Sequence, residues 1–295
     1  MRDAVLLIGH GSVESESDIP QFVANIRRGR PTPQSIVDEV THRWKAIGGS
    51  PLQRITQAQA AALQSRLGIP VVVGMRLFHP YAKEVVEGLA KRDISRVISL
   101  PLAPYSVHIY NETTREACAA AGLSCVEVPP WGESRALLEA FAATTRKAID
   151  TLPVDRRDAA HVVLTAHSLP TRIIREGDPY EAQVKATAAA VMRTLGAKNS
   201  YRVAFQSQGM DGGEWLGPDL KATFDALHRE GVHDVVVTAI GFLADHTEVL
   251  YDLDVEARAM AEKLGLSFTR AASLNDDPRL IDALESIARD AMAAV

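Results

Sequence analysis

The sequence has few cysteines and no excess of positive charge, and each of these shortages excludes a class of protein. Its 32 Lys and Arg residues are outnumbered by 37 Asp and Glu, so the net charge is −5 and a nucleic-acid partner is not expected. The two cysteines, Cys118 and Cys125, are too few for the four ligands of an iron–sulfur cluster. They do not indicate an oxidising compartment, and we interpret them as small buried apolar residues.

Long hydrophobic runs are also missing. No stretch approaches the roughly 20 apolar residues of a membrane span, and the apolar run at residues 4–9 is too short for a signal peptide. We therefore expect a cytoplasmic protein without an integral membrane segment. With 46% apolar residues in 295, the chain can bury a large core and build two domains of ordinary size.

Short β-branched runs alternate with amphipathic helical patterns along the whole chain. The runs lie at 4–9, 69–75, 96–102, 161–166, 201–206 and 234–242. Nearly continuous apolar strands that alternate with helices are typical of parallel sheets covered on both faces. The sequence therefore predicts an α/β fold.

The two halves of the chain resemble each other. "VLLIGHGS" is similar to "VVLTAHSLP", and both 93–124 and 231–267 show a strand, an irregular turn, a helix and Gly-Leu-Ser. We predict two similar Rossmann-like domains, residues 1–152 and 153–295, with the ligand site in the cleft between them. His10 and His167 each follow the first strand of their half, and this position makes both candidate site residues.

Acidic residues recur at four-residue spacing after the strand at 234–242. Read as a helix from about His246, the sequence stacks Glu248, Asp252 and Glu256 on one face. A solvated acidic face is the commoner explanation of such a row. This row starts beside a buried strand and a histidine, however, and carboxylates in line can pass cations or protons along.

The acidic row gives His167 a candidate role in the site. A single histidine after an apolar strand is more often a core residue than a ligand. Beside a carboxylate such as Glu248, its imidazole could accept a proton or bind a transition metal near neutral pH.

The motifs around these residues resemble those of the ferrochelatase family, whose members insert ferrous iron into a porphyrin. They are "IRRGRPTP", "RWKAIGGSPL", "GMRLFHP" and "YNE" in the first half, and "AHSLP", "GDPY", "QSQGMDGGEWLGPD" and "GFLADHTEVLYDLDVEA" in the second. The resemblance covers nearly the whole chain. It implies two chelatase-type domains and a lyase of haem biosynthesis that exchanges Fe²⁺ for two porphyrin protons and requires no cofactor.

The resemblance also implies roles for individual residues. His167 and Glu248 would be the catalytic residues that bind the iron and take up the pyrrole protons. Asp252 and Glu256 would continue from them as an acidic relay on a distorted helix. Asp245 and His246 match a supporting Asp-His pair. Arg27, Arg28 and Arg43 match basic positions that would bind the porphyrin by pairing with its propionates. Ser50 and Tyr110 match other porphyrin-binding polar positions that line the same cleft in relatives.

The sequence departs from the family at His10, where coproporphyrin-using relatives carry a tyrosine. "GHGS" is similar to the small cobaltochelatases that act on sirohydrochlorin, in which such a histidine is a metal ligand. His10 is therefore a candidate metal and porphyrin ligand, with a purely turn-shaping role as the alternative.

Two further readings of the function stay open at this point. One is a cobalt or nickel chelatase for sirohydrochlorin or a related tetrapyrrole, and the other is a non-catalytic tetrapyrrole or metal binder. Within the ferrochelatase reading, the arginine-rich motifs and the lack of an apolar lip favour coproporphyrin III over protoporphyrin IX. A transient haem-pathway partner enzyme is compatible with the sequence but is not specified by it.

Overall fold

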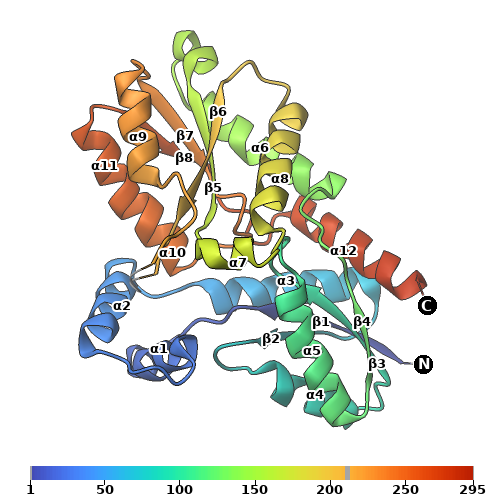
Figure 1. Cartoon of the computed structure of the whole chain (residues 1–295). Helices are drawn as coiled ribbons and strands as arrows, with labels where there is room; N and C mark the ends of the chain where they lie inside the picture. Colours follow the sequence, from blue (N-terminus) through green and yellow to red (C-terminus); the bar gives the residue numbers. More distant parts are fainter. Residues whose placement is uncertain (1, 210–212, 295) are drawn as a thin grey trace. The chain divides into compact units, whose positions relative to one another are not determined.

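The computed structural model describes residues 2–209 and 213–294 and divides into two compact units (Figure 1). Residues 210–212, within the "QSQGMDGGEWLGPD" motif, lie outside the described residues. Unit 1 is formed by Met1–Trp131, Ala244–His246 and Asn275–Val295. Unit 2 is formed by Gly132–Leu243 and Thr247–Leu274.

Unit 1 contains a four-stranded parallel sheet in the order β2-β1-β3-β4. The strands are β1 (Asp3–Gly9), β2 (Val71–Met75), β3 (Arg96–Pro101) and β4 (Ser124–Glu127). Helices α4 (Ala82–Ala90) and α5 (His108–Ala121) pack together on the sheet, and α3 (Leu52–Leu67) and α12 (Pro278–Ala293) form a second packed pair. Residues 4–8 of β1 are completely buried, as their unbroken apolar run predicts.

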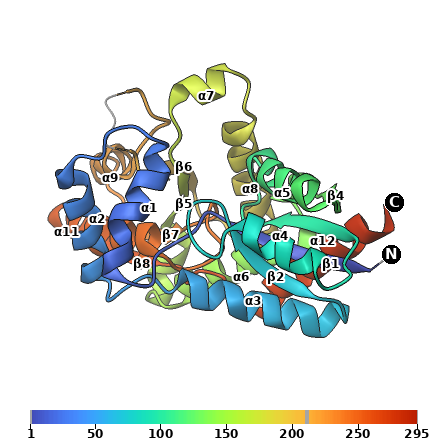
Figure 2. The same ribbon diagram turned by 90° about the horizontal axis from the view of Figure 1, so that it is seen from below.

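Two further helices of unit 1 carry the arginine-rich segment. They are α1 (Ile19–Arg27), which follows a 3₁₀ turn at Glu16–Asp18, and α2 (Gln34–Ala46). The two helices lie side by side in both views (Figures 1 and 2). Ile19, Val23 and Val37 join Phe78 in one small buried cluster between them, which anchors the segment to the unit.

Unit 2 repeats the same strand order, β6-β5-β7-β8, in a second parallel sheet. The strands are β5 (His161–His167), β6 (Tyr201–Gln206), β7 (Asp234–Thr238) and β8 (Ser267–Arg270). The helices are α6 (Arg135–Asp150), α7 (Thr171–Arg175), α8 (Tyr180–Leu195), α9 (Leu220–Arg229), α10 (Thr247–Tyr251) and α11 (Arg258–Lys263). The matching strand orders confirm the predicted pair of similar α/β domains.

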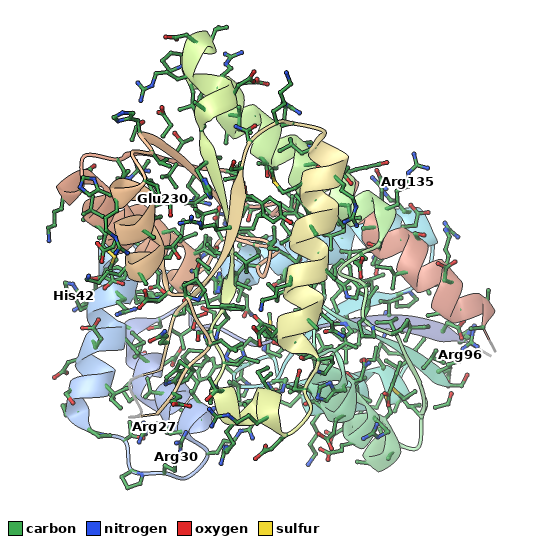
Figure 3. The ribbon with its side chains drawn as sticks, turned by 45° about the horizontal axis from the view of Figure 1, so that its top comes forward. Arg27, Arg30, His42, Arg96, Arg135 and Glu230 are labelled. Atoms are coloured by element: carbon green, nitrogen blue, oxygen red, sulfur yellow. The ribbon has the colours of Figure 1, made fainter. Side chains whose placement is uncertain are left out.

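The boundary between the units differs from the expected division at 152/153. Helix α6 precedes that boundary but packs on α8 and β7 of unit 2, whereas α12, at the end of the chain, packs on α3 and β3 of unit 1. In Figure 3, Arg96 of β3 lies beside α12, and its Nη2 donates to the Met292 carbonyl at 3.4 Å. The residues directly after the expected boundary form a 3₁₀ helix at Val154–Ala159. An amphipathic pattern shows that a helix buries one face but does not show which sheet it covers.

No helix within residues 2–209 and 213–294 combines the length and the hydrophobicity that a bilayer crossing needs.

Candidate active site

His167 is the last residue of β5, at the carboxyl edge of the unit 2 sheet. Its Nδ1 lies in hydrogen-bond contact with the Ser168 carbonyl oxygen. A carbonyl can only accept, so Nδ1 carries the proton and the neutral ring presents the lone pair of Nε2. The Tyr180 hydroxyl donates to the His167 carbonyl at 2.9 Å. These contacts orient the ring for ligation or proton transfer through Nε2.

Glu248 faces this lone pair. It is the second residue of α10, and its Oε1 lies 3.6 Å from His167 Nε2. The two side chains are 32% and 42% exposed, so the pair is accessible from solvent. The structure therefore brings together the two residues that the sequence analysis paired, although 80 residues separate them in the chain.

The electrostatics of the pair favour a charged imidazole. Burial lowers the pKa of His167, but the carboxylate of Glu248, the Ser168 carbonyl and the charge of Asp252 outweigh burial, so the pKa lies above the usual histidine value. His167 is thus a stronger base in the folded protein than a histidine in water.

The helix that carries the acidic row is not regular. It begins at Thr247 rather than His246, and Asp252–Ala257 form a π-helical turn between α10 and α11. The regular helix read from the spacing is therefore wrong, whereas the distortion implied by the family resemblance is present. π-Helical turns often occur at functional sites, because the extra residue re-aims the side chains around it.

The acidic side chains differ in their surroundings. Asp252 is only 6% exposed and accepts a hydrogen bond from the Ser207 hydroxyl, while Glu256 is half-buried. Asp254, on the same π-helical turn, is instead held by the guanidinium of Arg270, with N···O distances of 2.8 and 2.9 Å. The row is therefore not the fully solvated face that was its main alternative.

Gly241 fixes the spacing behind His167. Its main-chain N–H donates to the Thr165 carbonyl at 3.0 Å, and a Cβ at this position would lie 2.6 Å from the Ala166 Cβ and 2.7 Å from the Ala166 Cα. Only glycine allows so close an approach. The next side chain, Phe242, places its ring centroid 6.4 Å from that of His167. Sequence reasoning missed both residues.

The segment Ala244–His246 belongs to unit 1, where Asn275 holds it. The Asp245 main-chain N–H donates to Asn275 Oδ1 at 2.8 Å, and Asn275 Nδ2 donates to Asp245 Oδ2 at 2.9 Å. Gln59 Nε2 in turn donates to the Asn275 carbonyl at 2.6 Å. His246 Nδ1 lies 3.1 Å from the Ala244 carbonyl. Asn275, which sequence reasoning also missed, therefore fixes the segment directly before α10.

The arginines predicted to bind the porphyrin lie at two places in unit 1. Arg27 and Arg30 lie together at the end of α1 (Figure 3), where Arg30 Nε donates to the Arg27 carbonyl at 3.2 Å. Arg28 closes that helix with a left-handed φ of 50° and an exposed side chain. Arg43 on α2 is instead paired with Glu39, at 2.6 Å.

The other predicted unit 1 residues have distinct surroundings. His10 directly follows β1 and is exposed, and its carbonyl accepts from the Leu77 N–H at 3.0 Å. The Ser50 hydroxyl is buried without a hydrogen-bond partner among the described residues. The guanidinium carbon of Arg76 lies over the Tyr110 ring, 5.3 Å from the ring centroid. Burial lowers the pKa of Arg76.

Across the part of the chain that the structure describes, no three or more His, Cys, Asp or Glu side chains are grouped to hold a metal ion. His167 and Glu248 therefore form a two-residue candidate site.

Comparison with known proteins gives a consistent result. The ferrochelatase family model matches residues 2–292. The chain is 38% identical to a ferrochelatase from Acidobacterium capsulatum, over 99% of this chain and 95% of that protein. It is 33% identical to a coproporphyrin III ferrochelatase from Geobacillus thermodenitrificans, over 96% and 94% of the two chains.

Among solved structures, SirB from Bacillus subtilis with Fe3+ has a TM-score of 0.64 at 15% identity, over 99% of this chain and 96% of that one. CbiX, described as the terminal enzyme for biosynthesis of siroheme, has a TM-score of 0.60 at 14% identity, with 99% of both chains covered. At these identities the likeness shows a shared chelatase fold.

Proposed function

The chain belongs to the ferrochelatase family, lyases that insert iron into a porphyrin in haem biosynthesis, and we propose that His167 and Glu248 perform this insertion on coproporphyrin III. The observation that carries the proposal is the 3.6 Å approach of Glu248 Oε1 to His167 Nε2. The ring orientation enforced by the Ser168 carbonyl adds to it, because it turns Nε2 toward the carboxylate, so that Nε2 can share a cation with Glu248 when the ring is neutral and donates to Glu248 when the ring is protonated.

The pair suits a divalent cation. Nitrogen and oxygen ligands bind first-row metals at about 2.1 Å, so two donor atoms 3.6 Å apart can bind one ion together. Imidazole and carboxylate are both accepted by Fe²⁺. In this proposal the ion is a substrate that the pair holds briefly and then releases into the ring.

The same pair can accept protons. A porphyrin must lose two pyrrole protons as Fe²⁺ enters, and a bent ring exposes the nitrogen lone pairs that a flat ring shields. The raised pKa makes neutral His167 a good acceptor, and the carboxylate of Glu248 stabilises the imidazolium that results. Asp252 and Glu256 would then carry protons or iron along the distorted helix. The exchange of Fe²⁺ for two protons calls for no organic cofactor.

The polar groups of unit 1 supply the proposed contacts to porphyrin carboxylates. Arg27 and Arg28 close α1 with cationic side chains, and the buried Ser50 hydroxyl has no partner among the residues described. Such groups can bind carboxylates by charge-assisted hydrogen bonds, and these remote contacts can offset the strain of a bent ring. Arg43, already paired with Glu39, would have to exchange partners. Tyr110 and Asp245 with His246 remain supporting candidates.

Coproporphyrin III is the proposed porphyrin because it carries four carboxylates, whereas protoporphyrin IX carries two. The clustered arginines at the end of α1 match the more highly charged substrate. One group of relatives, including the Geobacillus thermodenitrificans protein, is named for this substrate. His10, directly after β1, stays a candidate residue for holding the metal.

An anaerobic assay tests the proposal. Purified protein is mixed with Fe²⁺ and either porphyrin, and metalloporphyrin formation is followed by absorbance. We expect multiple turnovers with coproporphyrin III and at least tenfold lower kcat/KM with protoporphyrin IX. His167→Ala should abolish insertion but retain porphyrin binding, measured by fluorescence quenching. His233→Ala, an exposed histidine before β7, is the matched control and should retain activity.

Two outcomes would count against the proposal. Binding of the porphyrin without turnover would make the protein a tetrapyrrole binder. Equal or better kcat/KM with protoporphyrin IX would refute the substrate assignment while leaving the family activity intact.

A further inference from the structure

Gln206, the register partner of His167, has a buried polar atom to which no described residue donates a hydrogen bond. It is the last residue of β6 and is only 3% exposed. Its Nε2 donates to the main-chain carbonyl of Glu248 at 3.1 Å. Within the described residues, its Oε1 has no hydrogen-bond partner.

The orientation of this amide is fixed by chemistry. A main-chain carbonyl can only accept a hydrogen bond, so the NH₂ group must face Glu248 and the amide oxygen must point elsewhere. Turning the amide over would place two acceptors against each other. The unpartnered atom is therefore the oxygen, an acceptor that lacks a donor.

The register of the sheet places the Gln206 side chain on the same face as His167. Gln206 is the register partner of His167 in the parallel β5–β6 pair, and the Ser168 N–H donates to the Gln206 carbonyl at 2.7 Å. Partner residues on adjacent parallel strands project to the same face of a sheet. The Gln206 amide thus shares a face with the His167 imidazole and is bonded to the residue that carries the opposing carboxylate.

An unsatisfied buried acceptor destabilises a fold, so a ligand that supplies a donor explains its presence better than packing does. The proposed substrate provides such a donor. Waters bound to a divalent cation are strongly polarised and donate readily, and an ion held by His167 and Glu248 would retain several of them.

We infer that Gln206 is an outer-shell residue of the iron insertion site, whose Oε1 accepts a hydrogen bond from water on the incoming Fe²⁺. This inference rests on the proposed function of the His167–Glu248 pair. It adds a third residue to the two-residue site, an amide that contacts the ion through water and is not one of the usual His, Cys, Asp and Glu ligands.

Two substitutions separate this role from a structural one. Gln206→Leu removes both the donor and the acceptor, whereas Gln206→Glu keeps an acceptor and loses only the donor to the Glu248 carbonyl. If Gln206 merely positions Glu248, both variants should weaken metal binding alike. If its oxygen faces the hydrated ion, only the leucine variant should.

The probe is Co²⁺, titrated into the full-length protein and followed by its visible absorption, with His167→Ala defining the signal of the site. We expect Gln206→Leu to raise the Co²⁺ Kd about 10-fold or more, in the range found for outer-shell partners of metal sites. Gln206→Glu should bind at least as tightly as the unaltered protein. Thr187→Val is the control. It removes a buried hydroxyl of unit 2 that, like the Gln206 amide oxygen, has no hydrogen-bond partner among the described residues, and it should leave the Kd unchanged.

The inference fails if Gln206→Leu keeps the original Kd, or if Gln206→Glu loses as much affinity as Gln206→Leu. Circular dichroism of each variant checks the fold. The insertion assay, with its KM for Fe²⁺, distinguishes failure of the proposed function from failure of the role of Gln206. No turnover by the unaltered protein refutes the proposed function, whereas turnover with an unchanged KM in Gln206→Leu refutes only the role of Gln206.

Discussion

Replacing Gly241 by alanine should disturb the active site through one methyl group. The added Cβ would lie 2.6 Å from the Ala166 Cβ and 2.7 Å from the Ala166 Cα, whereas carbon atoms in contact are normally about 3.5–4.0 Å apart. The turn after β7 must therefore move away from β5 by about 1 Å. Since the contact involves backbone, no side-chain rotation can relieve it.

The magnitude follows from this displacement. Overpacking of this kind costs about 1–3 kcal/mol of unfolding free energy. Ala166 directly precedes His167, so the shift passes to the imidazole. A misplacement of about 1 Å at a reacting group can lower a rate about 100-fold, and we expect a comparable fall in kcat for iron insertion, with porphyrin binding largely kept.

The assay pairs thermal unfolding with insertion kinetics. Gly88→Ala is the matched control, because its added Cβ meets nothing within 4 Å in the helix α4; it should keep activity and gain up to about 1 kcal/mol of stability. Ala166→Gly in the Gly241→Ala background should recover part of the lost kcat, since it removes the closer of the two contacts. A Gly241→Ala protein with unaltered stability and kcat would refute the argument.

Three further predictions concern Glu248, the charge of His167 and Asn275. Glu248→Gln removes the carboxylate that contributes most to raising the pKa of His167, so this pKa should fall in the variant. NMR titration of the imidazole ring measures it. An unchanged pKa would contradict the 3.6 Å approach of the two side chains. Because the folded-state pKa is raised, the pair stabilises the protein below the unfolded histidine pKa of about 6.5, and that contribution should disappear as the pH rises through the folded value. Asn275→Asp sets a carboxylate against Asp245 and should lower both kcat and stability. Adding Asp245→Asn in the same chain restores a hydrogen-bond donor and should rescue kcat. Failure of this rescue would show that the contact between residues 245 and 275 does not position the segment Ala244–His246.

Much of the fold follows from the sequence pattern. The strand runs and the duplication predicted two similar parallel sheets, and both sheets show the same strand order. The partners of α6 and α12 were not predictable, because amphipathic helices of similar length can cover either sheet. Strand β8 (Ser267–Arg270) was absent from the apolar runs, since it is an edge strand without a fully buried residue.

The site was predictable where its residues follow a rule of topology. His167 stands at the carboxyl end of a parallel strand, where ligands bind in such sheets, and Glu248 follows the neighbouring strand β7. Gln206 and Gly241 obey no such rule. Their importance lies in a side-chain oxygen to which no described residue donates, and in a space next to Ala166 that has no room for a Cβ. Both features exist only once the strands are assembled.

The π-helical turn shows why spacing alone was insufficient for the acidic row. In a regular helix, residues four apart lie on one face, so Glu248, Asp252 and Glu256 would be equivalent. The turn at Asp252–Ala257 breaks this equivalence: Asp252 is buried against Ser207, while Asp254 is drawn to Arg270. A hydrophobic pattern of one or two turns cannot distinguish a period of four residues from a slightly longer one. The distorted segment thus holds Asp252 as a buried carboxylate close enough to His167 to contribute to its raised pKa, while the neighbouring Asp254 forms an ion pair with Arg270.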